Sequence, residues 1–163
     1  MPSPACAEGL DIESYAFRAR VSEQTVLGRD APEEFEEYDV SASIDMDWHF
    51  FSLDWRLMGS AGLLRSSGKN ALALSVIPEI LFATADKRFM LDIGAGGALF
   101  SKYRFGSQDY GGPFQFALTL GLRIPLYKKL GVGYRFMHYS DAGINGPDTI
   151  GADFHMIEFV YRL

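Results

Sequence analysis

Alternation with a period of two residues is the feature that most constrains how this chain can fold. One segment places Phe114, Phe116, Leu118, Leu120, Leu122 and Ile124 against Gln115, Ala117, Thr119, Gly121 and Arg123. Successive side chains of a strand point to opposite faces, whereas a helix repeats every 3.6 residues, so this pattern predicts strands. We expect eight strands, within residues 15–21, 38–48, 53–57, 72–82, 89–102, 114–124, 130–140 and 155–163.

The two faces of these strands differ in a way that favours a polar interior. One face carries large apolar and aromatic residues, and the other mixes small residues with both signs of charge. The charged residues are Arg18, Arg56, Arg123, Arg135, Arg162, Asp45, Asp54, Glu79, Asp92 and Glu158. An eight-stranded barrel has just enough room for such a paired polar interior, and we expect Glu158 to pair with Arg135. A soluble lipocalin-like barrel with the apolar face inside is the alternative.

The segments between the strands alternate in length. Long segments cover residues 22–35, 104–113 and 141–152, a moderate one covers 64–70, and short ones cover about 49–51, 84–88 and 127–129. Long loops at one end and tight turns at the other are typical of outer-membrane barrels. The sequence therefore predicts an all-β fold: one domain over residues 1–163, an eight-stranded antiparallel transmembrane β-barrel of the outer-membrane type. Residues 1–10 are expected to be disordered.

Composition excludes several other classes of protein. The net charge is -6 and no Lys/Arg-rich run occurs, so a nucleic-acid partner is not expected. The most apolar stretch, "ALALSVIPEILFATA", is interrupted by Pro78 and Glu79, so a membrane-spanning helix is not expected either. The single cysteine, Cys6, allows no internal disulfide and no cysteine cluster for zinc.

The stretch "RFMHYSDAGI", residues 135–144, places His138 and Ser140 two positions apart on one face of a strand. Their Cβ atoms are then about 7 Å apart, so the imidazole can reach the hydroxyl and act as its base. A third group must orient such an imidazole. Asp153 shares the outward parity of the final strand, whereas Asp148 lies in the preceding loop, where parity does not apply.

Other polar residues near these strands have simpler explanations. Asp141 directly follows Ser140 and should point toward the lumen if the strand continues. His155 has outward parity and His49 lies near a predicted turn, so interfacial or loop positions account for both.

Three stretches together resemble a known family. They are "YRFMHYSDAGINGPDTIGAD" (134–153), "FMLDIGAGGALFS" (89–101) and "GSQDYGG" (106–112), and the chain looks like a member of the lipid A 3-O-deacylase (PagL) family. That family has an eight-stranded outer-membrane barrel with a Ser-His-Glu triad on its outer wall. The resemblance implies that Ser140 is the nucleophile, His138 the general base and acid, and Asp153 the orienting carboxylate. It also implies that the backbone N–H groups of Ala142 and Gly143 stabilise the oxyanion.

The implied activity is that of a serine esterase, which hydrolyses the 3-position acyl ester of lipid A in the outer leaflet of the bacterial outer membrane. Its partners are lipopolysaccharide and the surrounding lipids, and no metal or cofactor is implied. Two positions depart from the family pattern: Asp141 stands where Asn is usual, and Asp153 stands where Glu is usual, with Asp148 as the alternative acid. A non-catalytic barrel that serves as an anchor or adhesion surface is the alternative function.

Overall fold

The structure is a computed structural model that describes residues 11–21, 25–26, 29–30, 33–50, 53–86, 88–146 and 148–163. For residues 25–26, 29–30 and 47–50 it describes the backbone alone. Within these ranges, no helix is both long and apolar enough to cross a membrane. The predictions for residues 1–10, Cys6 and the side chain of His49 lie outside the described residues.

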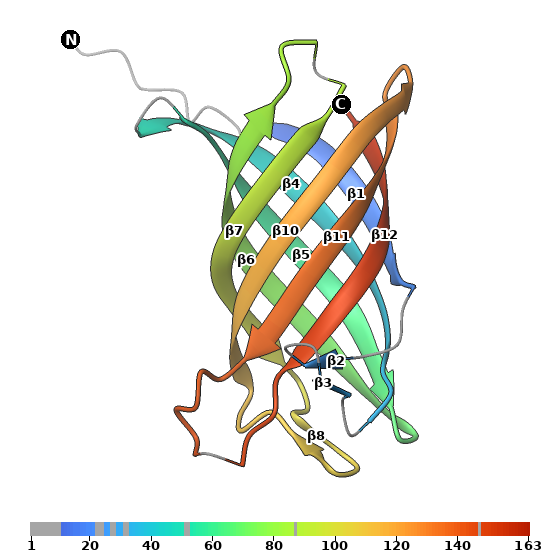
Figure 1. Ribbon diagram of the computed structural model, residues 1–163, viewed down its shortest axis with the longest axis vertical. Coiled ribbons are helices and arrows are strands. Elements are labelled where there is room, and N and C mark those ends of the chain that lie inside the picture. The colour runs from blue at the N-terminus through green and yellow to red at the C-terminus, as the bar shows by residue number, and fades with distance from the viewer. Residues whose placement is uncertain are drawn as a thin grey trace, which may run out of the picture.

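Eight long strands close into a barrel in the part of the chain that the structure describes (Figure 1). They are β1 (Ile12–Arg20), β4 (Glu36–Phe50), β5 (Leu53–Ser66), β6 (Lys69–Ala83), β7 (Met90–Phe100), β10 (Phe114–Tyr127), β11 (Leu130–Ser140) and β12 (Ala152–Arg162). Each long strand pairs antiparallel with the next, and β1 pairs with β12. Closure leaves no free sheet edge along the wall, and the predicted eight-stranded antiparallel barrel is confirmed.

The connections also follow the predicted alternation, with one difference. At the barrel end that is uppermost in Figure 1, β4 connects to β5, β6 to β7 and β10 to β11; the lower end carries the long loops from β1 to β4, from β7 to β10 and from β11 to β12. The first of these loops contains β2 (Thr25–Val26) and β3 (Arg29–Asp30), and the second contains β8 (Arg104–Phe105) and β9 (Gln108–Asp109). The moderate connection expected at 64–70 is instead a two-residue turn, because β5 and β6 stay paired as far as Ser66 and Lys69.

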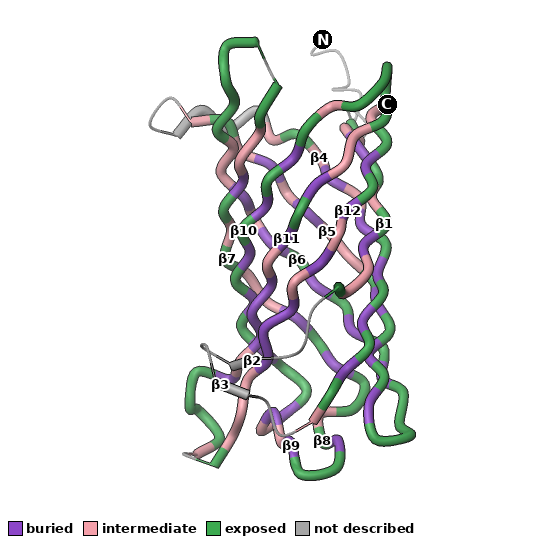
Figure 2. Tube along the Cα trace, turned by 45° about the vertical axis from the view of Figure 1, so that its right-hand side comes forward, coloured by how far each residue is buried: buried purple, intermediate pink, exposed green. Residues whose placement is uncertain are grey.

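The polar face of the strands is inside the barrel. Burial alternates along each strand in Figure 2, with exposed residues such as Phe17, Leu118 and Phe159 on the outer wall. Arg135 and Glu158 are fully buried on the opposite face. This arrangement confirms the predicted polar lumen and excludes the soluble lipocalin-like alternative, whose apolar face would be inside.

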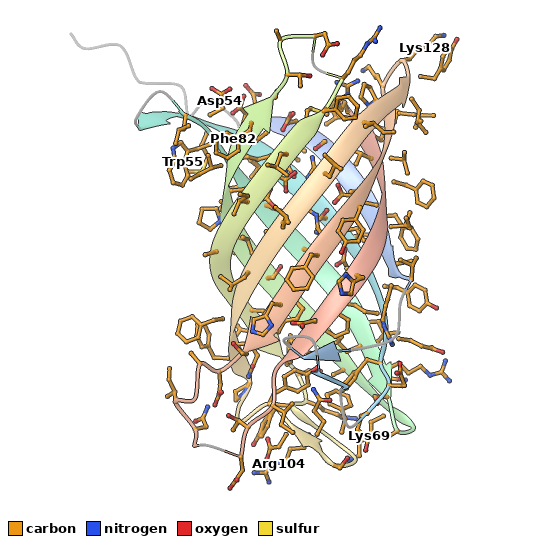
Figure 3. All side chains as sticks on the ribbon, viewed as in Figure 1. Asp54, Trp55, Lys69, Phe82, Arg104 and Lys128 are labelled. Carbon is orange, nitrogen blue, oxygen red and sulfur yellow. The ribbon has the colours of Figure 1, made fainter. Side chains whose placement is uncertain are left out.

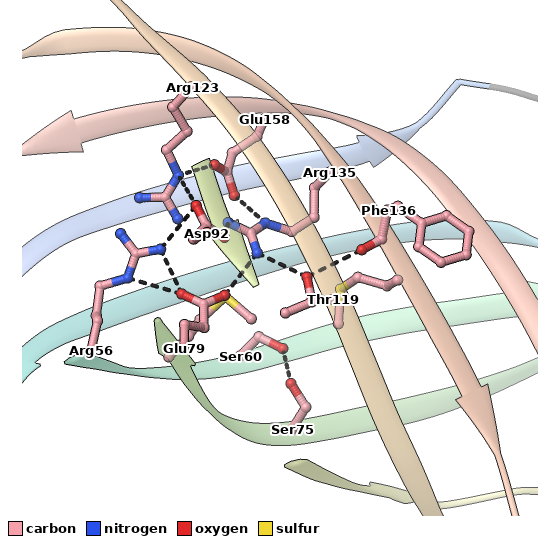
Figure 4. A network of polar contacts seen from close by, with 12 residues as sticks. Arg56, Ser60, Ser75, Glu79, Asp92, Thr119, Arg123, Arg135, Phe136 and Glu158 are labelled. Atoms are coloured by element: carbon pink, nitrogen blue, oxygen red, sulfur yellow. Dashed lines mark hydrogen bonds and ion pairs between the residues drawn. The ribbon is translucent and has the colours of Figure 1, made fainter. Parts of the chain in front are cut away.

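Arg135 lies at the centre of an ion-pair network that fills one part of the lumen (Figure 4). Its guanidinium lies 2.8 Å from a carboxylate oxygen of each of Glu79, Asp92 and Glu158. Arg123 adds a second contact to Glu158 at 2.6 Å. The predicted Arg135–Glu158 pair is therefore present. A guanidinium can donate five hydrogen bonds, so Arg135 contacts carboxylates from three strands, and Arg56 and Arg123 supply the other two positive charges.

Aromatic residues fill the lumen near the long loops. The rings of Phe35, Phe100, Phe105, Tyr110, Tyr139 and Phe154 contact one another edge to face, with centroids 4.9–6.3 Å apart. Phe105 and Tyr110 come from the loop 101–113, so this loop folds back into the mouth of the barrel. Tyr139 and Phe154 come from β11 and β12, and they pack the inner surface of the wall that carries the candidate site.

Substituting Arg135 should destabilise the barrel far more than substituting an exposed arginine. Arg135→Leu leaves Glu79, Asp92 and Glu158 buried with fewer cations, which costs about 3–5 kcal/mol for a broken buried pair. Arg65→Ala is the matched control, because its ion pair with Glu36 is largely exposed and contributes about 1 kcal/mol or less. Urea unfolding in detergent, followed by heat-modifiable gel mobility, measures both. Equal losses in the two variants would contradict the assigned role of the network.

Candidate active site

His138 and Asp153 face each other across β11 and β12. They are direct partners in the antiparallel register, and His138 Nδ1 lies 2.6 Å from Asp153 Oδ1. With the carboxylate of Asp153 as the acceptor, the Nδ1–H of His138 is the donor of this hydrogen bond. Leu118, the partner of His138 on β10, is exposed on the outer wall, which places His138 on that wall as well. The structure thus brings together two of the three residues expected from the sequence.

Both side chains are covered although they lie on the outer wall. His138 is 9% exposed and Asp153 is 3% exposed. The pairing between β1 and β12 ends at Arg20 and Met156, and β2 continues the sheet by pairing with β12 at Asp153 through Thr25. The first long loop therefore returns to the sheet beside the candidate carboxylate. Residues 22–35 were expected to form a loop, and this pairing was not predicted; the β-branched pair Thr25–Val26 is a local signal for it.

Ser140 lies two residues after His138 at the end of β11, and it is half-buried. Its hydroxyl has no hydrogen-bond partner in the described part of the chain, so it is free to turn toward His138. Gly151 lies against both residues: a Cβ atom at this position would be 3.1 Å from Ser140 Cβ and 3.3 Å from His138 Cε1. The same atom would lie 2.5 Å from the carbonyl oxygen of Tyr139, which is closer than real Cβ atoms approach. Glycine at position 151 thus allows the loop to lie directly over the His138–Ser140 pair.

Asp141 organises the loop that follows Ser140. Its Oδ1 accepts hydrogen bonds from Gly143 N at 2.9 Å and Thr149 Oγ1 at 2.8 Å, and its Oδ2 accepts one from Asn145 N at 3.0 Å. Burial opposes ionisation of this carboxyl, but the three hydrogen bonds outweigh it and lower the pKa of Asp141 below its usual value. The Asp141 carboxylate therefore binds three donors of its own loop, and these donors compensate its negative charge.

The turn at 141–144 has an unusual backbone. Ile144 N donates to Asp141 O at 3.2 Å, and both central residues have positive φ, 55° at Ala142 and 77° at Gly143. Two positive φ values are typical of a type I′ turn, and this conformation costs a residue with a side chain about 1–2 kcal/mol. The Gly143 N–H, one of the two expected oxyanion donors, is occupied by Asp141 in this structure.

The loop 101–113 braces this turn from the side. Gln108 Nε2 donates to Gly151 O at 2.9 Å, and Ile150 N donates to Asp109 O at 2.8 Å. At Gly111, with a φ of 84°, a Cβ atom would lie 2.5 Å from Asp141 Oδ2. Two loops that are separate in the sequence therefore form one support for the candidate site.

The remaining polar candidates lie apart from this constellation. Asp148 is exposed in the loop. His155 lies on the outer wall, where its Nδ1 hydrogen-bonds the hydroxyl of Tyr134 on β11, and its ring contacts Phe136. His155 therefore has a local partner in the lipid-facing wall, two residues along β12 from Asp153.

Comparison with known proteins identifies similar sequences and folds. The profile of the family described as "Lipid A 3-O-deacylase (PagL)" matches residues 36–162. The chain is 33% identical over 88 residues to lipid A deacylase PagL of Bordetella bronchiseptica (54% of this chain, 48% of that protein). It is 30% identical over 82 residues to lipid A deacylase PagL of Pseudomonas aeruginosa (50% and 47%). These matches span about half the length of the curated relatives.

Two solved structures share the fold over nearly their whole length. The crystal structure of the outer membrane enzyme PagL superposes with a TM-score of 0.70 at 22% identity, covering 92% of this chain and 99% of the other. The Yersinia pestis outer membrane protein Ail, solved in a phospholipid bilayer nanodisc, superposes with a TM-score of 0.57 at 14% identity, covering 94% and 100%. The predicted outer-membrane type of barrel is confirmed.

Replacing the carboxylate of Asp141 should loosen the turn beside Ser140. In Asp141→Asn one oxygen becomes an amide NH₂, which cannot accept from its present donors, and each hydrogen bond to a charged group is worth about 1.5–3 kcal/mol. We expect faster hydrogen exchange at residues 142–146, measured by mass spectrometry, while the exposed control Asp148→Asn leaves exchange unchanged.

The same turn should also loosen at low pH. Because the pKa of Asp141 is lowered in the folded state, its stabilisation of the turn is complete above the pKa of the unfolded carboxyl and is lost as pH falls through the folded pKa. Unchanged exchange in Asp141→Asn would refute this role.

A methyl group at position 151 should disturb the His138–Ser140 pair. In Gly151→Ala the new Cβ can be accommodated only if the backbone moves away from the Tyr139 carbonyl, so Ser140 and His138 shift relative to each other. We expect labelling of Ser140 by a serine-reactive fluorophosphonate to slow by roughly tenfold or more, as for a small misplacement of reacting groups. Gly112→Ala is the control, because its Cβ meets its nearest neighbour, Asn145 Nδ2, at an ordinary 3.4 Å. Equal labelling of the two variants counts against this role for Gly151.

Proposed function

The chain belongs to the lipid A 3-O-deacylase (PagL) family, and from this premise we propose that it hydrolyses the 3-position acyl ester of lipid A. The observation that carries the proposal is the His138–Asp153 hydrogen bond beside the half-buried Ser140, on the outer wall of the barrel. A nucleophile, a base and an orienting acid on one face are the components of a serine esterase. The position also suits an ester that is presented from the membrane rather than from the lumen.

In the proposed mechanism Asp153 holds the Nδ1–H of His138, so that Nε2 is free to accept a proton. Ser140 Oγ attacks the acyl carbonyl as its proton passes to Nε2. The tetrahedral intermediate collapses when His138 returns this proton to the 3-oxygen of the sugar, which leaves an acyl-enzyme. A water molecule activated by His138 then attacks the acyl group, and a hydroxy fatty acid and free Ser140 are formed.

Negative charge develops on the carbonyl oxygen in both steps, and the backbone N–H groups of Ala142 and Gly143 are the proposed donors to it. In the resting structure the Gly143 N–H donates to Asp141 Oδ1. We therefore assign the first contact to Ala142, and Gly143 contributes when it exchanges its bond to Asp141 for one to the substrate. Because the Asp141 carboxylate is held by three donors within its own loop, it is not left as an uncompensated charge beside the oxyanion.

The outer wall between the site and the opposite end of the barrel offers a surface along which the acyl chain can lie. Tyr134 and Phe136 precede His138 at every second position of β11, and Phe159 continues the apolar face on β12. An acyl chain in the outer leaflet can lie along these side chains with its ester at the level of Ser140. The proposed substrate then reaches the site without leaving the membrane.

The proposal predicts the loss of one hydroxyacyl chain from lipid A. The refolded protein is incubated with lipopolysaccharide, and the lipid A is weighed by mass spectrometry. We expect a mass loss of one 3-hydroxyacyl group with the unchanged chain and none with Ser140→Ala. Equal masses with and without protein would instead favour the non-catalytic anchor or adhesion barrel.

The same assay separates the two candidate acids. Asp153→Ala removes the group that orients His138, which in serine hydrolases costs roughly 10³–10⁴-fold in rate. Asp148→Ala, a substitution of the same kind at an exposed position of the adjoining loop, should leave the rate within about twofold. A large loss in Asp148→Ala with none in Asp153→Ala would transfer the orienting role to Asp148.

A further inference from the structure

A basic cavity lies at the loop end of the barrel, apart from the candidate active site. Lys69, Ser101, Lys102, Tyr103 and Arg104 line it, and its volume is about 390 Å³. We call these five residues the basic rim site. Figure 3 places Lys69 and Arg104 at the lower end of the barrel, opposite Lys128. Three of the five lining residues are cations, which is the composition of an anion-binding cavity.

Hydrogen bonds hold the two segments of this site together. Ser101 N donates to Leu72 O at 2.8 Å, and Leu72 N donates to Ser101 Oγ at 2.8 Å, so the segment after β7 is fastened to the start of β6. Lys69 Nζ approaches Arg104 O at 3.4 Å. The guanidinium of Arg104 lies 5.6 Å from the ring centroid of Tyr103. The cations therefore converge on one cavity instead of spreading over the rim.

The positive charge of the site is only partly compensated. Arg104 Nε pairs with Asp109 Oδ2 at 2.7 Å, a contact that uses one of the five N–H donors of the guanidinium. The carboxylate of Glu33 attracts Lys69, but it also accepts hydrogen bonds from Ser67 and from both the N–H and the hydroxyl of Ser107. Lys102 is exposed and forms no ion pair within the described ranges. An anion in the cavity would meet Lys102 without displacing an existing partner.

The height of the site on the barrel indicates where such an anion comes from. Leu72 and Leu99 are 49% and 55% exposed on the lipid-facing wall. Lys69 and Lys102 lie three residues beyond them toward the loop end, roughly 10 Å along each strand. Cations directly above an apolar wall lie at the level of lipid head groups.

We propose that the basic rim site binds a phosphate group on the sugar head of lipopolysaccharide, whose acyl chains then lie along Leu72 and Leu99. The cavity is larger than a phosphate alone needs, and Ser101 and Tyr103 add hydroxyl groups that can contact the sugar. Lys102 and Arg104 supply the charge-assisted hydrogen bonds to the phosphate oxygens. The ligand is thus a phosphorylated glycolipid of the outer leaflet.

This site is distinct from the one at Ser140. Ser140 is aligned across the sheet with Phe116 on β10 and Gly97 on β7, and Lys102 lies five residues beyond Gly97. The separation is roughly 20 Å from strand spacing and rise. Binding here does not depend on hydrolysis at Ser140, so the two proposals can fail independently.

Binding of lipopolysaccharide to the full chain in zwitterionic detergent tests the proposal. All proteins carry Ser140→Ala so that the ligand stays intact. We expect Lys69→Ala, Lys102→Ala and Arg104→Ala together to weaken binding at least tenfold, and Lys102→Ala alone to weaken it severalfold. The matched control is Lys128→Ala with Lys129→Ala, which removes two exposed cations at the opposite end of the barrel (Figure 3). The control should bind as the parent does.

Two further arms identify the ligand chemistry. Lipopolysaccharide treated with phosphatase should bind the parent as weakly as the intact lipid binds the triple variant. Inorganic phosphate alone should compete only at much higher concentration than the lipid. Equal binding by the triple variant and the parent, equal binding of the dephosphorylated lipid, or equal weakening in the Lys128/Lys129 control overturns the proposal. If the triple variant does not fold, by heat-modifiable gel mobility, Lys102→Ala decides, since its side chain has no ion pair to lose.

Discussion

Arg135 binds three carboxylates, which it balances together with Arg56 and Arg123, inside a barrel whose outer wall faces hydrocarbon, and most of the structure follows from this arrangement. A strand in a bilayer must satisfy its backbone hydrogen bonds within the protein, so the sheet has to close. An eight-stranded barrel encloses too little space for a water channel, and side chains must fill it. With the apolar face of the wall in contact with lipid, charged side chains fill one part of the lumen and the aromatic cluster fills the part near the loops. Buried charges are tolerable only as pairs. Both the alternation and the charges of the sequence therefore follow from one constraint, which is that a closed eight-stranded barrel in lipid must fill its own interior.

The same alternation explains how much could be predicted from sequence. Strand parity separates Arg135 and Glu158 from His138 and Asp153, and the structure confirms the lumenal pair and brings the outward pair within hydrogen-bond distance. Parity is a property of one strand and needs no knowledge of neighbours. The catalytic roles of Ser140, His138 and Asp153 stay predictions.

What could not be predicted depends on contacts between distant loops. The addition of β2 beside Asp153 requires that β1 stop pairing with β12 at Arg20, and no local pattern specifies this. The insertion of Phe105 and Tyr110 into the mouth of the barrel looks, in sequence, like two aromatic residues in a polar loop. Asp141 was expected to point into the lumen only if the strand continued; the strand ends at Ser140, and the Asp141 carboxylate accepts hydrogen bonds from donors within its own loop.

The register between β11 and β12 determines when the candidate site can form during insertion into the membrane. If β12 shifted by one residue against β11, His138 would lie opposite Ala152 or Phe154, and the side chain of Asp153 would turn to the lumenal face. The hydrogen bond between His138 and Asp153 therefore forms only after β11 and β12 have paired in their final register. A chain still in transit, with β11 and β12 apart, has no such pair. In the function proposed above, ester hydrolysis would therefore begin only once these two strands have paired in the membrane.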